Sequence, residues 1–223
     1  QIEEEMDRNL KIISRLDKKA SIKYVISTSN ELKARKTALG LKKDGTLFVS
    51  QKLLKRSNPN KKNNSAGYTG TFKPDLAFVG EIDLNIGDKK IEIISINNDG
   101  NSMVFLPKNN VLFTGPIYTN KKYPRLDFEN GYSFSLILSS LSNIITKAND
   151  NTIIVPGNGI VAKKSDLVNY NTVMTRIIKQ VTTLIENGKT LENVLAMKNI
   201  TKNLDAQGFG EGPVTTEMFP LTP

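Results

Sequence analysis

The side chains able to carry chemistry in this sequence are hydroxyls, amines and carboxylates, because its 223 residues include no histidine and no cysteine. Histidine is the commonest metal ligand and the usual general base near neutral pH, and cysteine supplies thiolate nucleophiles, disulfides and thiolate metal sites. Ser29 and Ser102 therefore have no histidine to activate them. Lys33 could act as an amine nucleophile only if it were buried. The composition thus disfavours the commonest kinds of nucleophilic and metal-dependent catalysis.

Acidic residues gather in one predicted hairpin, over residues 78–96. Glu81 and Asp83 alternate with apolar residues and Asp88 lies in the turn, so we interpret all three as parts of a solvated face rather than as paired catalytic carboxylates. A second acidic segment, DGNS at 99–102, resembles part of a calcium loop but lacks the ligand spacing of an EF-hand.

The chain is basic, with 31 Lys and Arg against 22 Asp and Glu and a net charge of +9. Its densest basic stretch lies in and just before an Asn-, Ser- and Gly-rich loop, NPNKKNNSAG, without the helical stripe or regular aromatic residues that nucleic-acid-binding faces usually show. Lysine and asparagine are abundant throughout, which accounts for the charge without a selected surface. Polyanion binding is kept as an alternative, through Lys52, Lys55, Arg56, Lys61 and Lys62.

Hydrophobic periodicity predicts the elements that must position these residues. The predicted helices cover residues 2–19, 134–148, 164–187 and 190–198, with a helical turn before Gly40 and a short helix at QKLLKR; the predicted strands are 22–28, 46–50, the hairpin 78–96, 102–107, 110–115 and 151–157. Strands alternate with helices in a mixed α/β order. We expect a single domain over residues 1–203 and an extended C-terminal arm over 204–223.

Four segments carry a resemblance to a known family. They are INNDGNSMVFLP, NVLFTGPIYTNKKYPRLDF, TIIVPGNGIVAKKSDLVNY and LIENGKTLENVLA, and in order and spacing they resemble the metallo-β-lactamase fold, in which a PGHG turn precedes a long helix. YVISTSNELKA resembles the strand and loop that hold the HxHxDH motif of that family. The resemblance implies an α/β fold, an αββα sandwich, in which a metal-bound hydroxide performs hydrolysis.

The same resemblance implies seven metal-ligand positions, and the residues found there differ from the ligands of the family. Zinc is held by imidazole, thiolate or carboxylate, and only Glu31 offers one of these. We therefore expect no cofactor, no metal and no enzymatic activity, so that the chain would be a pseudoenzyme. The positions are Ser29, Glu31, Lys33 and Ala34 for HxHxDH, Asn97 for the next histidine, Pro116 for the bridging aspartate and Asn158 for the histidine of PGHG.

Family members place several β-strands ahead of the first long helix, where this chain begins. The resemblance therefore implies an incomplete N-terminal sheet, whose open edge or apolar face is a template for another chain. We expect a structural or assembly role through protein partners, either a second copy or a separate fragment that supplies the missing strands. Alternatives are a fold that closes without those strands, and a small ligand bound near Tyr118, Tyr123 and Phe128.

No run of 18 apolar residues exists, so no membrane span is expected. The chain begins at Gln1, without a charged-then-apolar leader. We interpret this as processing before Gln1, and expect a secreted, surface or particle-associated protein.

Overall fold

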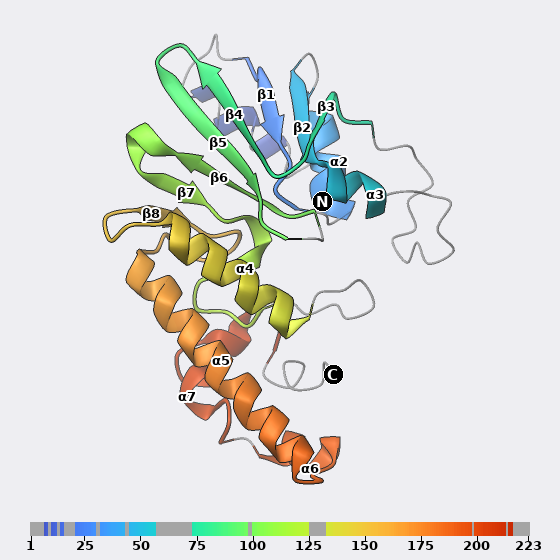
Figure 1. Cartoon of the computed structure of the whole chain (residues 1–223), viewed down its shortest axis with the longest axis vertical. Coiled ribbons are helices and arrows are strands. Elements are labelled where there is room, and N and C mark those ends of the chain that lie inside the picture. Colours follow the sequence, from blue (N-terminus) through green and yellow to red (C-terminus); the bar gives the residue numbers. More distant parts are fainter. Residues whose placement is uncertain are drawn as a thin grey trace. The chain divides into compact units, whose positions relative to one another are not determined.

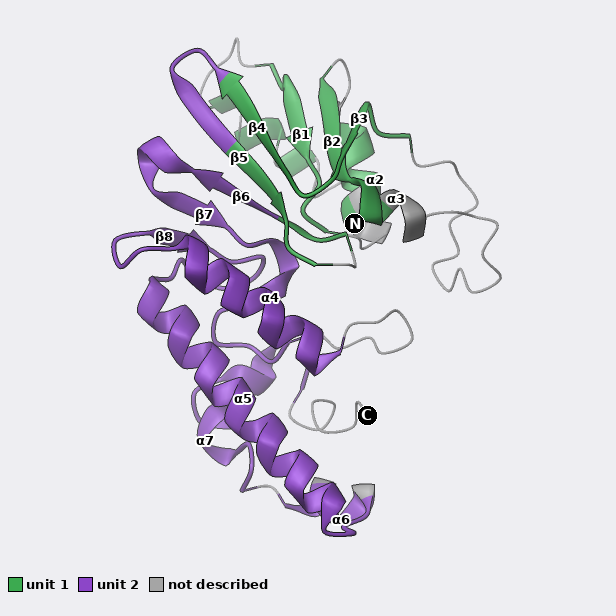
Figure 2. Cartoon of the chain, in the orientation of Figure 1, with its two compact units in different colours: residues 1–85, 92–102 green, residues 86–91, 103–223 purple. Residues whose placement is uncertain are grey.

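Two units make up the chain, one of residues 1–85 and 92–102 and the other of residues 86–91 and 103–223 (Figure 2). The structure is a computed structural model. It describes residues 7–8, 10–12, 14–15, 21–29, 32–42, 45–56, 73–97, 100–124, 133–197, 199–212 and 214–215. Residues 7–8, 10–12 and 14–15 are helical and lie within the predicted first helix.

The first unit contains a parallel three-stranded sheet in the order β1-β2-β3 (Figure 1). Its central strand is buried almost throughout, which is typical of parallel strands covered on both faces. Leu47 and Val49 of that strand pack with Ala38 and Leu53 in the core. The elements are β1 (Tyr24–Ile26), α2 (Leu32–Lys42), β2 (Thr46–Ser50), α3 (Gln51–Arg56) and β3 (Leu76–Phe78). Helix α2 continues past Gly40, where the sequence predicted a stop.

The predicted hairpin is present as β4 (Glu81–Ile86) and β5 (Lys89–Ser95). Gly87 takes a positive φ of 60° in its turn, a conformation that glycine adopts without strain. The tip of the hairpin, Ile86–Ile91, belongs to the second unit. The hairpin begins a five-stranded sheet in the order β4-β5-β6-β7-β8.

The remaining strands of this sheet are β6 (Ser102–Leu106), β7 (Val111–Phe113) and β8 (Ile153–Val155). Strand β7 pairs antiparallel with β6 and parallel with β8. Two short 3-10 helices, η1 (Pro107–Asn109) and η2 (Gly115–Ile117), lie before and after β7. Each begins with or contains a proline near its start, where the missing N–H costs no hydrogen bond.

Two helices pack together in the second unit, α4 (Phe134–Lys147) and α5 (Lys164–Glu186). Ser133 caps α4 by accepting a hydrogen bond from the backbone N–H of Leu136, and the Asp166 carboxylate accepts one from the N–H of Lys163 at the start of α5. Buried residues recur every three or four positions, as an amphipathic helix requires. They are Ile137, Ser140, Leu141 and Ile144 in α4, and Leu167, Tyr170, Met174 and Ile177 in α5.

The C-terminal region differs from the expected extended arm. Helix α6 (Leu191–Ala196) is followed by α7 (Lys202–Asp205) and by the 3-10 helix η3 (Phe209–Glu211). The chain folds here because Leu204 and Phe209 are buried, which composition rich in glycine did not indicate. Residues 216–223 lie outside the described residues. Among the described helices, none combines the length and apolar character that a membrane crossing needs.

The mixed α/β class predicted from the sequence is confirmed. The predicted helices at 134–148 and 164–187 are also present, as α4 and α5, and the predicted strands at 110–115 and 151–157 are present as β7 and β8.

Candidate functional site

A tight turn around Gly157 and Gly159 lies against the loop that follows β7, within the second unit. A Cβ on Gly157 would lie 2.4 Å from the carbonyl oxygen of Gly115, and one on Gly159 would lie 2.6 Å from that of Asn120. Gly159 also has a φ of +97°. Only glycine permits this close approach of two backbones. We call residues 156–159 the glycine turn.

Hydrogen bonds fix the glycine turn in place. The N–H of Gly157 donates to the carbonyl of Tyr118 at 3.1 Å, and the N–H of Asn120 donates to the carbonyl of Asn158 at 3.0 Å. The Asn120 side chain is 7% exposed and uses both ends of its amide: it donates to the carbonyl of Ile160 at 3.0 Å and accepts from the Tyr118 hydroxyl at 2.9 Å. The side chain of Asn158 itself is exposed.

The predicted metal-ligand positions that the structure describes fall into two groups. Pro116 and Asn158 belong to the second unit, where the Cβ position of Gly157 lies 2.8 Å from the Cα of Pro116. Ser29 and Asn97 belong to the first unit, and each is buried, at 7% and 8% exposure. Glu31 and the side chain of Lys33 lie outside the described residues; Ala34 is half-buried on α2.

Small uncharged polar residues gather beside Ser29 and Asn97. The N–H of Ser102 donates to the carbonyl of Thr28 at 3.1 Å, and the hydroxyls of Ser50 and Ser95 lie 3.2 Å apart. Ser102 is 0% exposed, and its Oγ has no hydrogen-bond partner among the described residues. This cluster follows the carboxyl ends of β1 and β2, which is where ligands bind in open parallel sheets.

The described side chains at the predicted metal positions do not fit a zinc ion. They are a hydroxyl, a methyl group, a pyrrolidine ring and two amides, whereas zinc takes imidazole, thiolate or carboxylate. These side chains belong to Ser29, Ala34, Asn97, Pro116 and Asn158. The wider prediction of a metal-free chain stays a prediction.

A group of carboxylates lies on the hairpin in the first unit, where the sequence indicated Glu81 and Asp83 on one face but not Glu92. Carboxylate oxygens of Glu81, Asp83 and Glu92 all fall within 4.8 Å of one another, the one such group among the described residues. Glu92 is on β5 opposite the other two on β4, so alternation along both strands could have indicated their shared face. Asp88 does not join them, because it pairs with Lys108 across the hairpin tip, and this hydrogen bond lowers the pKa of the Asp88 carboxyl.

The predicted polyanion loop is described only in part. Lys52 is half-buried on α3, while the side chains of Lys55 and Arg56 and the whole of Lys61 and Lys62 lie outside the described residues. Polyanion binding therefore stays a prediction.

An apolar sheet face in the second unit is exposed, and sequence reasoning missed it. Val111 pairs with Ile153 and Phe113 with Val155, so these four side chains share one face. Residue 162 pairs antiparallel with Ile154, which places Val161 beside Val155 on the same face. Phe113, Ile153 and Val161 are 37%, 47% and 59% exposed. We call Val111, Phe113, Ile153, Val155 and Val161 the exposed sheet face.

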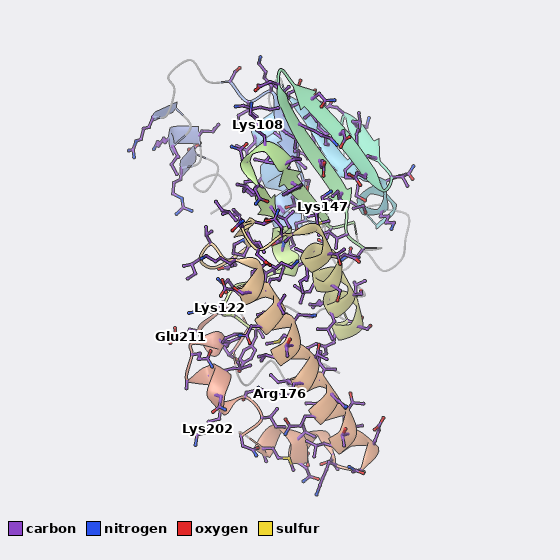
Figure 3. All side chains as sticks on the ribbon, turned by 60° about the vertical axis from the view of Figure 1, so that its left-hand side comes forward. Lys108, Lys122, Lys147, Arg176, Lys202 and Glu211 are labelled. Carbon is purple, nitrogen blue, oxygen red and sulfur yellow. The ribbon has the colours of Figure 1, made fainter. Side chains whose placement is uncertain are left out.

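The opposite face of these strands is covered. Leu112, Ile154 and Ala162 are 0%, 0% and 4% exposed. Phe105, which pairs with Leu112, lies under the ammonium of Lys147 at the end of α4, 5.4 Å from the ring centroid. Helix α4 thus covers one face of the sheet, and Figure 3 labels Lys147 on this helix and Lys108 near the strands. The exposed sheet face is turned away from α4.

Solved structures match the chain in fold, although no protein-family model and no curated protein matches its sequence. A metallo-β-lactamase from Pontibacter korlensis matches with a TM-score of 0.58 and 16% identity, over 75% of this chain and 76% of that one. The BLEG-1 B3 metallo-β-lactamase matches with a TM-score of 0.62 and 20% identity, over 76% and 84%. The sec-alkylsulfatase Pisa1 from Pseudomonas sp. matches with a TM-score of 0.58 and 12% identity, over 84% of this chain but 38% of that one.

The chain therefore has the metallo-β-lactamase fold, as the sequence resemblance predicted. At these identities the likeness extends to the fold alone.

The prediction that the chain is not an enzyme is wrong by this comparison. Proteins with its fold include β-lactamases and a sulfatase, which are enzymes. The prediction rested on the absence of histidine at the predicted metal-ligand positions. That absence bears only on reactions that need histidine there. Other sites on the same scaffold can support other chemistry.

Proposed function

We propose that the chain acts through protein–protein contacts as a subunit of an assembly, and that its exposed sheet face packs against the same face of a second copy. The observation that carries the proposal is the shared face of five apolar residues, of which Phe113, Ile153 and Val161 are 37–59% exposed. Contiguous exposed apolar residues mark interaction surfaces, because burying them on association is favourable by roughly 25 cal/mol per Å².

The absence of charge on this face favours a second copy as the partner. A chain of net charge +9 repels its own copies, yet the five side chains of the face are all uncharged. The five side chains therefore bring no like charges together, and the exposed Lys163, two positions after Val161, lies at the rim of the face. Sheets commonly pack face to face in this way, about 10 Å apart.

The edges of the five-stranded sheet are poorly suited to pairing with a strand from another chain, whereas its exposed face is suited to packing. β4 is the outermost strand at one end, and its Glu81 and Asp83 are exposed. Charged residues on an edge strand oppose pairing with another chain. At the other end, residue 162 already pairs with Ile154 of β8. The proposal is thus face packing rather than completion of a sheet by an added strand.

Analytical ultracentrifugation of the purified chain tests the proposal. The unchanged chain is expected to sediment as a dimer of its 24.7 kDa subunit, and Ile153→Asp and Val161→Asp are expected to sediment as monomers. Ile185→Asp is the matched control, because Ile185 is 59% exposed like Val161 but lies on α5, away from the face.

A monomer of the unchanged chain at micromolar concentration overturns the proposal. Equal dissociation by Ile185→Asp also overturns it, since the effect would then not depend on this face. Circular dichroism of each variant verifies that the charged residue has not unfolded the chain.

A further inference from the structure

Residues 201–212 form a segment, here called the C-terminal strap, that is tied to the loop 118–124 at several points. The Tyr123 hydroxyl donates to Oδ1 of Asp205 at 2.6 Å, and the N–H of Tyr123 donates to the carbonyl of Phe209 at 3.4 Å. Nζ of Lys122 donates to the carbonyl of Gly208 at 3.1 Å and lies 3.9 Å from Oε2 of Glu211. Figure 3 labels Lys122 and Glu211 at this contact.

Aromatic rings extend this contact to helix α5, within the second unit. Phe209 is stacked on Tyr170, with centroids 6.2 Å apart and an interplanar angle of 15°. Tyr170 meets Tyr118 edge to face at 5.2 Å. The Tyr170 hydroxyl donates to the carbonyl of Lys122 at 3.1 Å. Phe209, Tyr170 and Tyr118 are 6%, 3% and 0% exposed, so all three rings are buried.

Hydrogen bonds connect Tyr118, one of these rings, to the end of the exposed sheet face. The Tyr118 hydroxyl donates to Asn120, and Asn120 donates to the carbonyl of Ile160, the residue before Val161. On the other side of Val161, residue 162 is paired with Ile154. The backbone is thus held by hydrogen bonds on both sides of Val161. The bond at Ile160 depends on the loop 118–124, which is bonded to the strap.

We propose that the C-terminal strap positions residues 157–162, and with them Val161, so that the exposed sheet face is ready to pack before it meets its partner. Phe209, Tyr123 and Asp205 are the positioning residues. Ordering the rim of the face in advance removes part of the entropy cost of association. The inference rests on the proposed function for its biological purpose, but the positioning itself is measured separately.

Hydrogen–deuterium exchange on the full chain measures the positioning. The reporters are the amides of Gly157 and Ala162, bonded to the carbonyls of Tyr118 and Ile154 at 3.1 and 2.9 Å. Phe209→Ala, Tyr123→Phe and Asp205→Ala are expected to speed their exchange about tenfold or more. Asp205→Asn keeps an acceptor for the Tyr123 hydroxyl and is expected to retain slow exchange. The Ala148 amide, bonded to Ile144 in α4, reports on the rest of the unit.

Val194→Ala is the matched control, because Val194 is 3% exposed in α6, which precedes the strap in sequence and is not part of it. It is expected to leave Gly157 and Ala162 unchanged. Unchanged exchange in Phe209→Ala overturns the inference, as does equal acceleration of Ala148, which would signal general unfolding. Sedimentation of the unchanged chain decides the proposed function independently, so the two failures are distinguishable.

Discussion

The side-chain amide of Asn120 donates a 3.0 Å hydrogen bond to the carbonyl oxygen of Ile160, 40 positions further along the chain. Its other end accepts the hydroxyl proton of the buried Tyr118. One amide therefore joins the loop after β7 to the segment after the glycine turn. Its bond to Ile160 needs an amide rather than a carboxylate, because only the amide has a proton to donate.

Asn120→Asp is expected to lower the free energy of unfolding by about 1–3 kcal/mol at pH 7, because a carboxylate oxygen would face the Ile160 carbonyl without a proton between them. The loss should shrink near pH 3, where the protonated carboxyl can donate again. Chemical denaturation at both pH values measures this. Asn109→Asp, at an exposed position, is the control, and an equal loss there would contradict the explanation.

Stability is expected to fall steeply above pH 10. Burial raises the pKa of Tyr118, Tyr123 and Tyr170, and for Tyr123 the hydrogen bond to Asp205 adds to the effect. The unfolded chain ionises these phenols near pH 10 while the folded chain keeps their protons, so rising pH favours unfolding by up to about 1.4 kcal/mol per pH unit for each phenol.

Urea denaturation at a series of pH values, with tyrosinate absorbance as a second signal, checks this expectation. Stability should be flat below pH 10 as far as these three groups determine it. Tyr170→Phe should reduce the slope above pH 10, and an unchanged slope in that variant would count against a buried phenol at position 170.

Gly159→Ala is expected to cost more than Gly188→Ala. Both glycines have positive φ, +97° and +75°, so each substitution pays a similar backbone cost of about 1–2 kcal/mol. A Cβ at Gly188 meets nothing within 4 Å, whereas one at Gly159 would lie 2.6 Å from the carbonyl oxygen of Asn120. The difference between the two unfolding free energies, about 1–3 kcal/mol, isolates the cost of that contact; equal losses would show that the turn yields freely.

Ser102→Ala is expected to leave the free energy of unfolding unchanged or to raise it. The Ser102 hydroxyl is 0% exposed and has no partner among the described residues, so its burial is a cost that alanine removes. Ser50→Ala is the comparison, because the Ser50 hydroxyl lies 3.2 Å from that of Ser95 and its loss should cost about 1 kcal/mol. A clear loss in Ser102→Ala would reveal a bound water or ligand at this hydroxyl.

Dialysed protein is expected to hold no stoichiometric zinc at the predicted metal positions, because the described residues there offer no imidazole, thiolate or carboxylate. Elemental analysis by mass spectrometry measures this directly. Zinc near one equivalent that is lost in Asn97→Ala or Asn158→Ala would contradict the interpretation of these positions.

Much of the fold could be predicted because its elements have strong local patterns. The alternation in residues 81–86 and 89–95 and the three-to-four spacing in α4 and α5 are local properties, and each element is where its pattern indicated. The predicted end of α2 at Gly40 was wrong, because Gly40 is helical and the helix continues to Lys42. The folded strap was missed because Phe209 is buried against residues far away in sequence, Tyr123 and Tyr170.

The sites were harder to predict. The exposed sheet face depends on which strands are neighbours, and strands as short as β7 and β8 carry too little alternation to show which face stays open. The glycine turn was recognised from its sequence, but its partner Asn120 was not, because a single asparagine in a loop has no pattern around it. The shared fold, by contrast, was predicted from the resemblance of four sequence segments, and the match to solved structures confirms it.

The hairpin β4–β5 makes both units discontinuous along the gene, since the chain passes into the second unit at Ile86, returns to the first after Ile91 and leaves it finally after Ser102. A cut before residue 86 leaves the second unit whole and a cut after residue 102 leaves the first unit whole, but no single cut separates two intact units. During synthesis on the ribosome, the first unit stays unfinished until residue 102 has emerged, by which time a piece of the second already exists. The two units are thus expected to mature together, and truncation libraries should find no stable fragment ending between residues 86 and 102.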